Sequence, residues 1–181
     1  NYIDNNFVEW TNEHSAEPAL GNQFSFGGMA ITGNIFFASN VADSFKFIVI
    51  KPFGPDHFIH GLSVVGNTFR AINGFIDGVE KIDTTFADLD CSRMRTLELS
   101  GNTFDGVRHE VFHPAVLTHD QDTPSATWTL QTERFLPFEG RARFVDAVVS
   151  SGKLSDASNA AVYLAPSVTP SQGVDSRDVA L

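Results

Sequence analysis

Residues 64–69, Val-Val-Gly-Asn-Thr-Phe, recur nearly unchanged at 99–104 as Leu-Ser-Gly-Asn-Thr-Phe. Related phrases stand at 31–36, Ile-Thr-Gly-Asn-Ile-Phe, and at 3–8, Ile-Asp-Asn-Asn-Phe-Val. Successive asparagines of these phrases are 28, 33 and 35 residues apart, and they are Asn6, Asn34, Asn67 and Asn102. Self-similarity at periods of about 20–50 residues indicates a stack of structural repeats. The recurring motif therefore predicts that the fold is built from stacked repeats.

The residues before each Gly-Asn pair alternate between apolar and polar, as in Leu97-Glu98-Leu99-Ser100. Such alternation indicates a strand with one buried face, and Gly-Asn ends the strand because both residues tolerate a positive φ. The next similar strand comes only about 30 residues later, so the strands stack in parallel rather than as hairpins. We therefore predict an all-β fold, a parallel β-helix of about four coils over residues 1–110. The asparagines would form a ladder at one corner, and the core column would be Val8, Phe36, Phe69 and Phe104.

This arrangement resembles the right-handed parallel β-helix of the pectate lyase-like superfamily, which includes many phage tailspikes. The four phrases carry the resemblance, and asparagine ladders and stacked core aromatics are typical of that family. The phrases indicate a fold and no particular activity. An ordinary β-sandwich with four coincidental Asn-Gly turns is the alternative.

The rest of the chain is predicted to interrupt and then leave the repeats. Residues 11–28 look like an excursion from which Phe24 and Phe26 return to the core, and Asn73-Gly74 looks like a further corner. Residues 111–127 are predicted to be a connector. Residues 128–181 are predicted to be an antiparallel β cap or sandwich, with alternating runs at 128–132, 141–148 and 160–164 and a last strand near 178–181.

The composition narrows the classes of partner. A net charge of −10 argues against nucleic acid and anionic membranes. It also disfavours a highly anionic polysaccharide, unless local Arg, Lys or a cation intervenes. Cys91 is the single cysteine, so an internal disulfide is impossible and a small buried hydrophobe is expected. The chain begins inside the repeat pattern, which predicts a piece of a longer polypeptide. No cofactor is predicted.

A literal His-Glu-x-x-His motif stands at His109–His113, between Gly106 and Pro114. Zinc proteases place such histidines one helical turn apart, but the short distance between the glycine and the proline leaves barely two turns. On a strand the two histidines would be about 13 Å apart, too far to share a metal. We predict no metal site here.

The resemblance implies clustered carboxylates, often with calcium, and a basic residue on the outer face of a sheet. Stacking predicts two outward columns, one of Tyr2, Ala30, Ser63 and Glu98 and the next of Asp4, Thr32, Val65 and Ser100. Neither column holds a basic residue or an adjacent carboxylate pair. Asp88, Asp90 and Arg93 are the catalytic candidates that remain, although a solvated loop with surface ion pairs is the favoured interpretation of these residues.

Carbohydrate binding requires exposed aromatic rings beside fixed polar groups. The candidates are Trp10, at a strand exit, and Asp56, His57 and His60, in a Gly-Pro-led loop. Trp10 is equally well explained as a core residue at the end of a strand. For His57 and His60, histidines of a surface loop are the favoured interpretation.

Together these features predict a spike or adhesin domain that binds cell-surface or capsular polysaccharide for host attachment. Its expected setting is a phage-like particle, as a homotrimer with other spike or particle proteins, at an extracellular or virion surface. A polysaccharide lyase or glycoside hydrolase on the same scaffold is the alternative. A structural spacer is the third possibility.

Overall fold

The computed structural model describes residues 1–12, 24–121, 123–156 and 158–181. The chain divides into two compact units, Asn1–Ala115 with Arg134–Gly140, and Val116–Glu133 with Arg141–Leu181. Each is described by itself, and the domain boundaries predicted at residues 110 and 128 stay a prediction. Most of the predicted excursion, residues 13–23, lies outside the described residues. In the described residues the only helices are three short 3-10 turns, η1 (Cys91–Arg93), η2 (Glu133–Phe135) and η3 (Pro137–Glu139).

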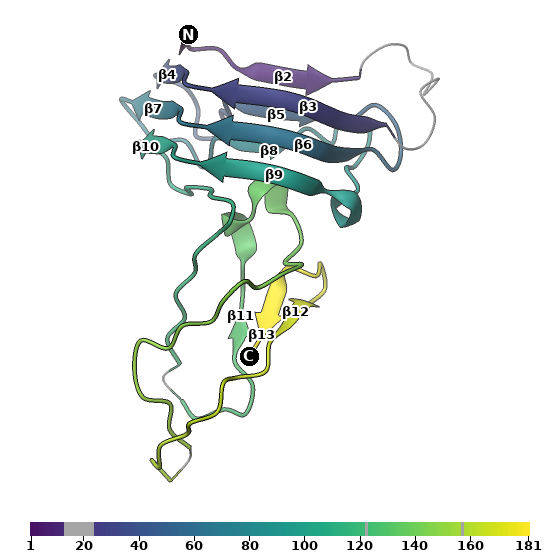
Figure 1. Cartoon of the computed structure of the whole chain (residues 1–181). Coiled ribbons are helices and arrows are strands. Elements are labelled where there is room, and N and C mark those ends of the chain that lie inside the picture. Colours follow the sequence, from purple (N-terminus) through teal and green to yellow (C-terminus); the bar gives the residue numbers. More distant parts are fainter. Residues whose placement is uncertain (13–23, 122, 157) are drawn as a thin grey trace. The chain divides into compact units, whose positions relative to one another are not determined.

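The first unit consists of three parallel sheets whose strands stack in chain order (Figure 1). Consecutive strands pass from one sheet to the next, and each sheet gains a strand every 32–40 residues. The chain is thus nearly all β with stacked parallel strands, as predicted. The sheets are β1 (Tyr2–Asp4), β4 (Ile35–Ser39), β7 (Thr68–Ile72) and β10 (Thr103–Asp105); β2 (Val8–Thr11), β5 (Ile48–Lys51) and β8 (Glu80–Ile82); and β3 (Ser25–Thr32), β6 (Phe58–Val65) and β9 (Arg95–Ser100).

An asparagine ladder lies where β3, β6 and β9 turn into the next sheet. The backbone N–H of Asn34 donates to Asn67 Oδ1 at 3.0 Å, and that of Asn67 donates to Asn102 Oδ1 at 2.9 Å. All three side chains are buried, and buried amides need such partners. The predicted fourth member, Asn6, is wrong: Asn1 takes that place and donates from Nδ2 to Asn34 Oδ1 at 2.9 Å.

A column of aromatic rings fills the core beside the ladder. The rings of Phe36 and Phe69 stack at 4.9 Å, and those of Phe69 and Phe104 at 5.7 Å. Strand register places Ile3 next in this column. The prediction of Val8 is wrong, because Val8 lies in β2 opposite Ile48.

The misplaced first phrase marks a different corner of the same fold. It contains Asn5, which has a φ of 45° where β1 ends. Asn40, Asn73 and Gly106 also have positive φ, directly after β4, β7 and β10. Asparagine and glycine tolerate this left-handed backbone, so the same residue types mark both corners. The predicted corner at Asn73-Gly74 is confirmed.

An irregularity in β3, β6 and β9 decides which residues face outward. Gly28, Gly61 and Thr96 have positive φ at one level of the sheet. Inward residues are therefore three positions apart there, as with Ile59 and Leu62, both buried. The stacking of Ala30, Ser63 and Glu98 is confirmed by the register, as is that of Thr32, Val65 and Ser100. Tyr2 and Asp4 were wrongly placed in these columns, since both belong to β1.

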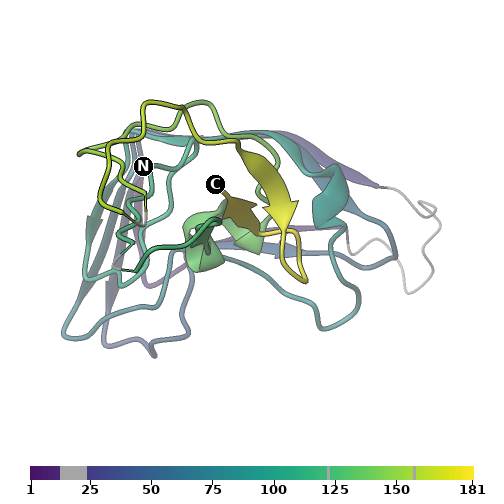
Figure 2. The ribbon, with the colours of Figure 1, turned by 90° about the horizontal axis from the view of Figure 1, so that it is seen from below.

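The last repeat is covered by residues Arg134–Gly140. Phe138 is 2% exposed and belongs to the same core cluster as the stacked phenylalanines. Its N–H donates to Glu80 Oε1 at 3.0 Å. Glu80 continues the column of Val8 and Ile48, so a carboxyl group stands at an inward position. Figure 2 looks along the stack of strands, with the sheets arranged around this core.

The second unit holds an antiparallel sheet in the order β11 (Thr129–Leu130), β13 (Asp178–Ala180), β12 (Thr169–Gln172). The predicted strands near residues 128–132 and 178–181 are confirmed in this shortened form. Those at 141–148 and 160–164 are wrong, because neither run forms a strand. Phe144 and Tyr163 in these runs are largely exposed, so the alternation has no core to pack against.

Candidate functional site

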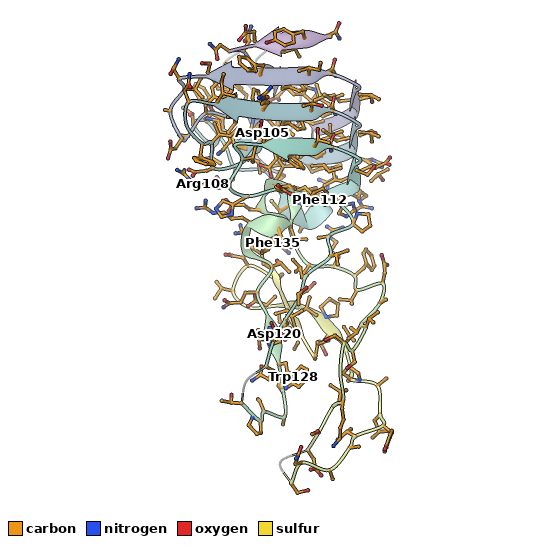
Figure 3. All side chains as sticks on the ribbon, turned by 90° about the vertical axis from the view of Figure 1, so that its left-hand side faces the viewer. Asp105, Arg108, Phe112, Asp120, Trp128 and Phe135 are labelled. Atoms are coloured by element: carbon orange, nitrogen blue, oxygen red, sulfur yellow. The ribbon has the colours of Figure 1, made fainter. Side chains whose placement is uncertain are left out.

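The outer side of the β1–β4–β7–β10 sheet carries two complete columns of outward residues. We call it the four-strand face. Strand register defines its members as Tyr2, Ile35, Thr68 and Thr103 in one column and Asp4, Phe37, Arg70 and Asp105 in the next. Neighbouring strands lie about 4.8 Å apart, so four rungs cover about 14 Å. Figure 3 shows this side of the molecule, with Asp105 labelled.

The upper half of the four-strand face is aromatic. The rings of Tyr2 and Phe37 stack with their centroids 6.1 Å apart and 23° between their planes. Tyr2 is 61% exposed, and Ile35 beside it is 46% exposed. Exposed rings on a rigid sheet lose little entropy on binding, and their faces suit the apolar faces of sugar rings.

The lower half of the same face is polar and already ordered. Arg70 Nε lies 2.8 Å from Asp105 Oδ2, and Thr103 Oγ1 donates to Thr68 Oγ1 at 3.1 Å. Both charged side chains are more than half exposed. These groups offer hydrogen-bond donors and acceptors at fixed positions beside the aromatic pair. An arrangement of this kind can bind a hydroxyl-rich polymer that runs across the strands.

Trp10 and His57 lie in or against the core. The Trp10 ring contacts Phe26 edge-on at 5.4 Å, and the side chain is only partly exposed. His57 is 0% exposed, with Nε2 2.7 Å from Asn12 Nδ2 and Nδ1 accepting from the N–H of Phe24. Burial lowers the pKa of His57. The expectation of a surface histidine is wrong here, and a buried ring has no surface for direct contact with a polymer.

Asp56 and His60 are exposed but lie apart from the four-strand face. Asp56 occupies a turn before β6 with a φ of 59°. His60 lies in β6 and faces outward from the β3–β6–β9 sheet, with Arg95 as its register partner. Phe24 and Phe26 both return to the core, as predicted.

The catalytic candidates do not converge on one point. Asp90 caps η1 and accepts from the N–H of Ser92 at 2.8 Å. The Arg93 guanidinium lies over the Phe58 ring at 3.9 Å. Asp88 is exposed, and no hydrogen bond or ion pair joins it to Arg93 within the described residues. The arrangement is that of a capped turn rather than of an acid–base couple.

Residues 109–113 form no helix. The N–H of His109 donates to the carbonyl of Asp77 at 3.0 Å, and His113 exchanges backbone hydrogen bonds with Leu99. In the described part of the chain, no group of three or more His, Cys, Asp or Glu side chains could hold a metal ion.

Two further carboxyl groups, Asp77 and Glu80, have shifted pKa values. Arg108, labelled in Figure 3, pairs with Asp43 at 2.6 Å and with Asp77 at 2.9 Å, which lowers the pKa of Asp77. Burial raises the pKa of Glu80 to about 7. A carboxyl group with such a pKa could exchange protons near neutrality. Glu80 nevertheless faces inward beneath Phe138, so it is placed for structure and not for substrate.

Reasoning from the sequence alone missed Phe37, Arg70 and Asp105. The signal was the same alternation that identified the strands, applied after the Gly-Asn pair instead of before it. In 35–37, 68–70 and 103–105 the middle residue is always phenylalanine, so both of its neighbours face outward.

No protein-family profile, characterised protein or solved structure that we compared with the chain matches it. None of the helices in the described residues is long and apolar enough to cross a membrane.

Proposed function

We propose that the first unit is a right-handed parallel β-helix of the pectate lyase-like type that binds cell-surface or capsular polysaccharide. In this proposal the chain is part of a spike or adhesin on a phage-like particle. The stacked parallel strands, the buried asparagine ladder and the phenylalanine column support the architecture. A fold does not determine which ligand is bound, so the support for binding comes from the residues of the four-strand face.

The observation that carries the proposal is the combination on that face of Tyr2 stacked on Phe37 beside the Arg70–Asp105 pair. The strands lie at constant spacing, so aromatic and polar contacts follow one another across four strands. A linear polymer can use such contacts simultaneously, whereas a small metabolite would use one. Weak contacts of each sugar would add through several copies, and a homotrimer on the particle would supply them.

An enzyme on the same scaffold remains the alternative function. Inverting glycosidases hold two carboxyl groups about 6.5–9.5 Å apart and retaining enzymes about 5–5.5 Å, both open to the substrate. On the four-strand face the carboxylates are Asp4 and Asp105, which stand at opposite ends of one column. Asp105 is also paired with Arg70. The face therefore favours binding over hydrolysis.

The test is retention of oligosaccharides from a capsular glycan panel, measured together with reducing-end and unsaturated products. We expect the protein to retain long oligosaccharides much better than monosaccharides and to release no product. A Tyr2→Ala/Phe37→Ala variant should lose most of this retention, because it removes the stacking surface.

The matched control is Phe144→Ala/Tyr163→Ala, which removes the same two residue types from largely exposed positions in the second unit. It should retain glycans as the unmodified chain does. Equal retention by both variants would contradict the proposed site. Product formation would favour the enzyme instead.

A further inference from the structure

Two arginines on the outer side of the β3–β6–β9 sheet differ from the ion-paired arginines of the same unit. Arg70 pairs with Asp105 at 2.8 Å, and Arg108 pairs with two aspartates at 2.6 and 2.9 Å. Within the described residues, neither Arg93 nor Arg95 has a carboxylate at ion-pair distance. Among the residues that the structure describes, these two guanidinium groups thus have no carboxylate partner, in a chain of net charge −10.

Each of the two side chains has a contact that orients it. The Arg93 guanidinium lies over the Phe58 ring, 3.9 Å from its centroid. Stacking of this kind fixes the guanidinium plane and leaves its N–H edge open to an oxyanion. Arg95 Nε donates to the backbone carbonyl of Arg93 at 3.2 Å, so the second guanidinium is oriented toward the first residue.

Strand register adds a third polar group and an open surface. His60 is the partner of Arg95 on the neighbouring strand and is exposed. On the other side of His60 the partner is Gly27. A Cβ at Gly27 would lie 2.6 Å from the carbonyl oxygen of His60, so this position excludes a side chain. Gly27 itself therefore places no side chain beside His60.

The nearest acidic side chains along the chain are engaged elsewhere. Glu98 Oε1 accepts from Ser100 Oγ at 2.9 Å, at the C-terminal end of β9, whereas Arg95 begins that strand. Asp90 accepts from the N–H of Ser92 in the cap of η1. Neither carboxylate neutralises the arginines, and a ligand can do so.

We propose that Phe58, His60, Arg93 and Arg95 form a binding site for a carboxylate or sulfate group carried by an acidic polysaccharide. The inference rests on the proposed function and adds the class of sugar. A chain with this net charge repels an acidic polymer over most of its surface, so a local cationic site is required for attachment. Planar guanidinium groups bind such oxyanions with two parallel hydrogen bonds.

The experiment compares three polymers of equal length that share one backbone: dextran, carboxymethyl dextran and dextran sulfate oligomers. Calorimetry on the full chain should give tighter binding of the charged oligomers. Arg93→Gln/Arg95→Gln should weaken their binding on the order of tenfold or more and leave neutral dextran unchanged. Added salt should weaken the charged oligomers in the unmodified chain and have little further effect in this variant.

The control is Arg141→Gln/Arg143→Gln, which removes two arginines at the same spacing in the second unit and gives the same net charge. It should bind all three polymers as the unmodified chain does. Arg93→Lys/Arg95→Lys should bind the charged oligomers with an affinity between those of the unmodified chain and Arg93→Gln/Arg95→Gln, because the charge stays but the planar guanidinium is lost. Thermal unfolding checks that each variant is folded. Equal losses in both glutamine variants, or no preference for the charged oligomers, would overturn the inference. Retention that depends on Tyr2 and Phe37 would still stand in that case, so the two failures are distinguishable.

Discussion

The backbone N–H of Phe138 donates a hydrogen bond to the Glu80 carboxylate, with 3.0 Å between N and Oε1. This contact joins residues that are 58 positions apart in the chain, at the last strand of a stack whose inward column otherwise holds Val8 and Ile48. Phe138 and Glu139 both have positive φ, 53° and 51°, a backbone that costs roughly 1–2 kcal/mol per residue when it is not glycine. Burial of Phe138 and the bond to Glu80 hold the segment in this conformation.

The first prediction is that Glu80 makes the first unit less stable as pH rises from about 5 to 7. Burial raises the pKa of Glu80 to about 7 from 4.5, so the folded state binds the proton more tightly than the unfolded state. The free energy of unfolding therefore decreases by up to about 3 kcal/mol as the pH rises from the unfolded pKa to the folded pKa of Glu80. Glu80→Gln should remove this slope and be more stable than the unmodified chain at pH 8.

Urea unfolding followed by Trp10 fluorescence, in a Trp128→Phe background, measures this dependence. Glu9→Gln is the control, because Glu9 is exposed on the outer side of the same sheet. A slope that persists in Glu80→Gln would show that another group is responsible.

The second prediction concerns the aromatic column. Phe69 is fully buried, and its ring contacts those of Phe36, Phe47 and Phe104. Phe69→Ala should lower the free energy of unfolding by about 3–5 kcal/mol, as large core truncations do. Phe75→Ala, at a position 56% exposed, should cost far less. Similar losses in the two variants, measured by urea unfolding, would argue against a stacked core.

The third prediction concerns the asparagine ladder. Asn67 Oδ1 accepts from the N–H of Asn34 at 3.0 Å, and Nδ2 donates to the carbonyl of Ile31 at 2.8 Å. Asn67→Ala leaves these buried groups unpaired, at about 1–3 kcal/mol each. Asn6→Ala should change little, because Asn6 is exposed and outside the ladder. Thermal unfolding of both variants decides which asparagines form the ladder.

The repeat, its period and the inward phenylalanines could be predicted from the sequence, because alternation and Gly-Asn turns are local signals. The first repeat was assigned to the wrong corner, since the asparagines of two different corners look alike in sequence. The buried state of His57 could not be predicted, because it depends on Asn12 and Phe24, which are distant along the chain. Of the candidate site, Tyr2 was recognised as outward, but its stacking on Phe37 required the register between β1 and β4.

The fourth prediction is that His109 and His113 bind no zinc. Residues 109–113 form no helix, so the two rings do not share the helical face that a zinc site uses. His109 is exposed, and its N–H bond to Asp77 is made by the backbone, so His109→Ala should keep full stability and glycan binding. Zinc content after dialysis, measured by mass spectrometry, should be negligible. Stoichiometric zinc that disappears in His109→Ala would refute this.

Binding of a polysaccharide to the four-strand face can be tested by mapping a retained capsular oligosaccharide onto the chain by amide chemical-shift changes. If the four-strand face binds the polymer, the largest changes should fall in β1, β4, β7 and β10, around Tyr2, Phe37 and Arg70, and should vanish in Tyr2→Ala/Phe37→Ala. Shift changes confined to other sheets, or no shift changes with any oligosaccharide of the panel, would show that the four-strand face does not bind the polymer.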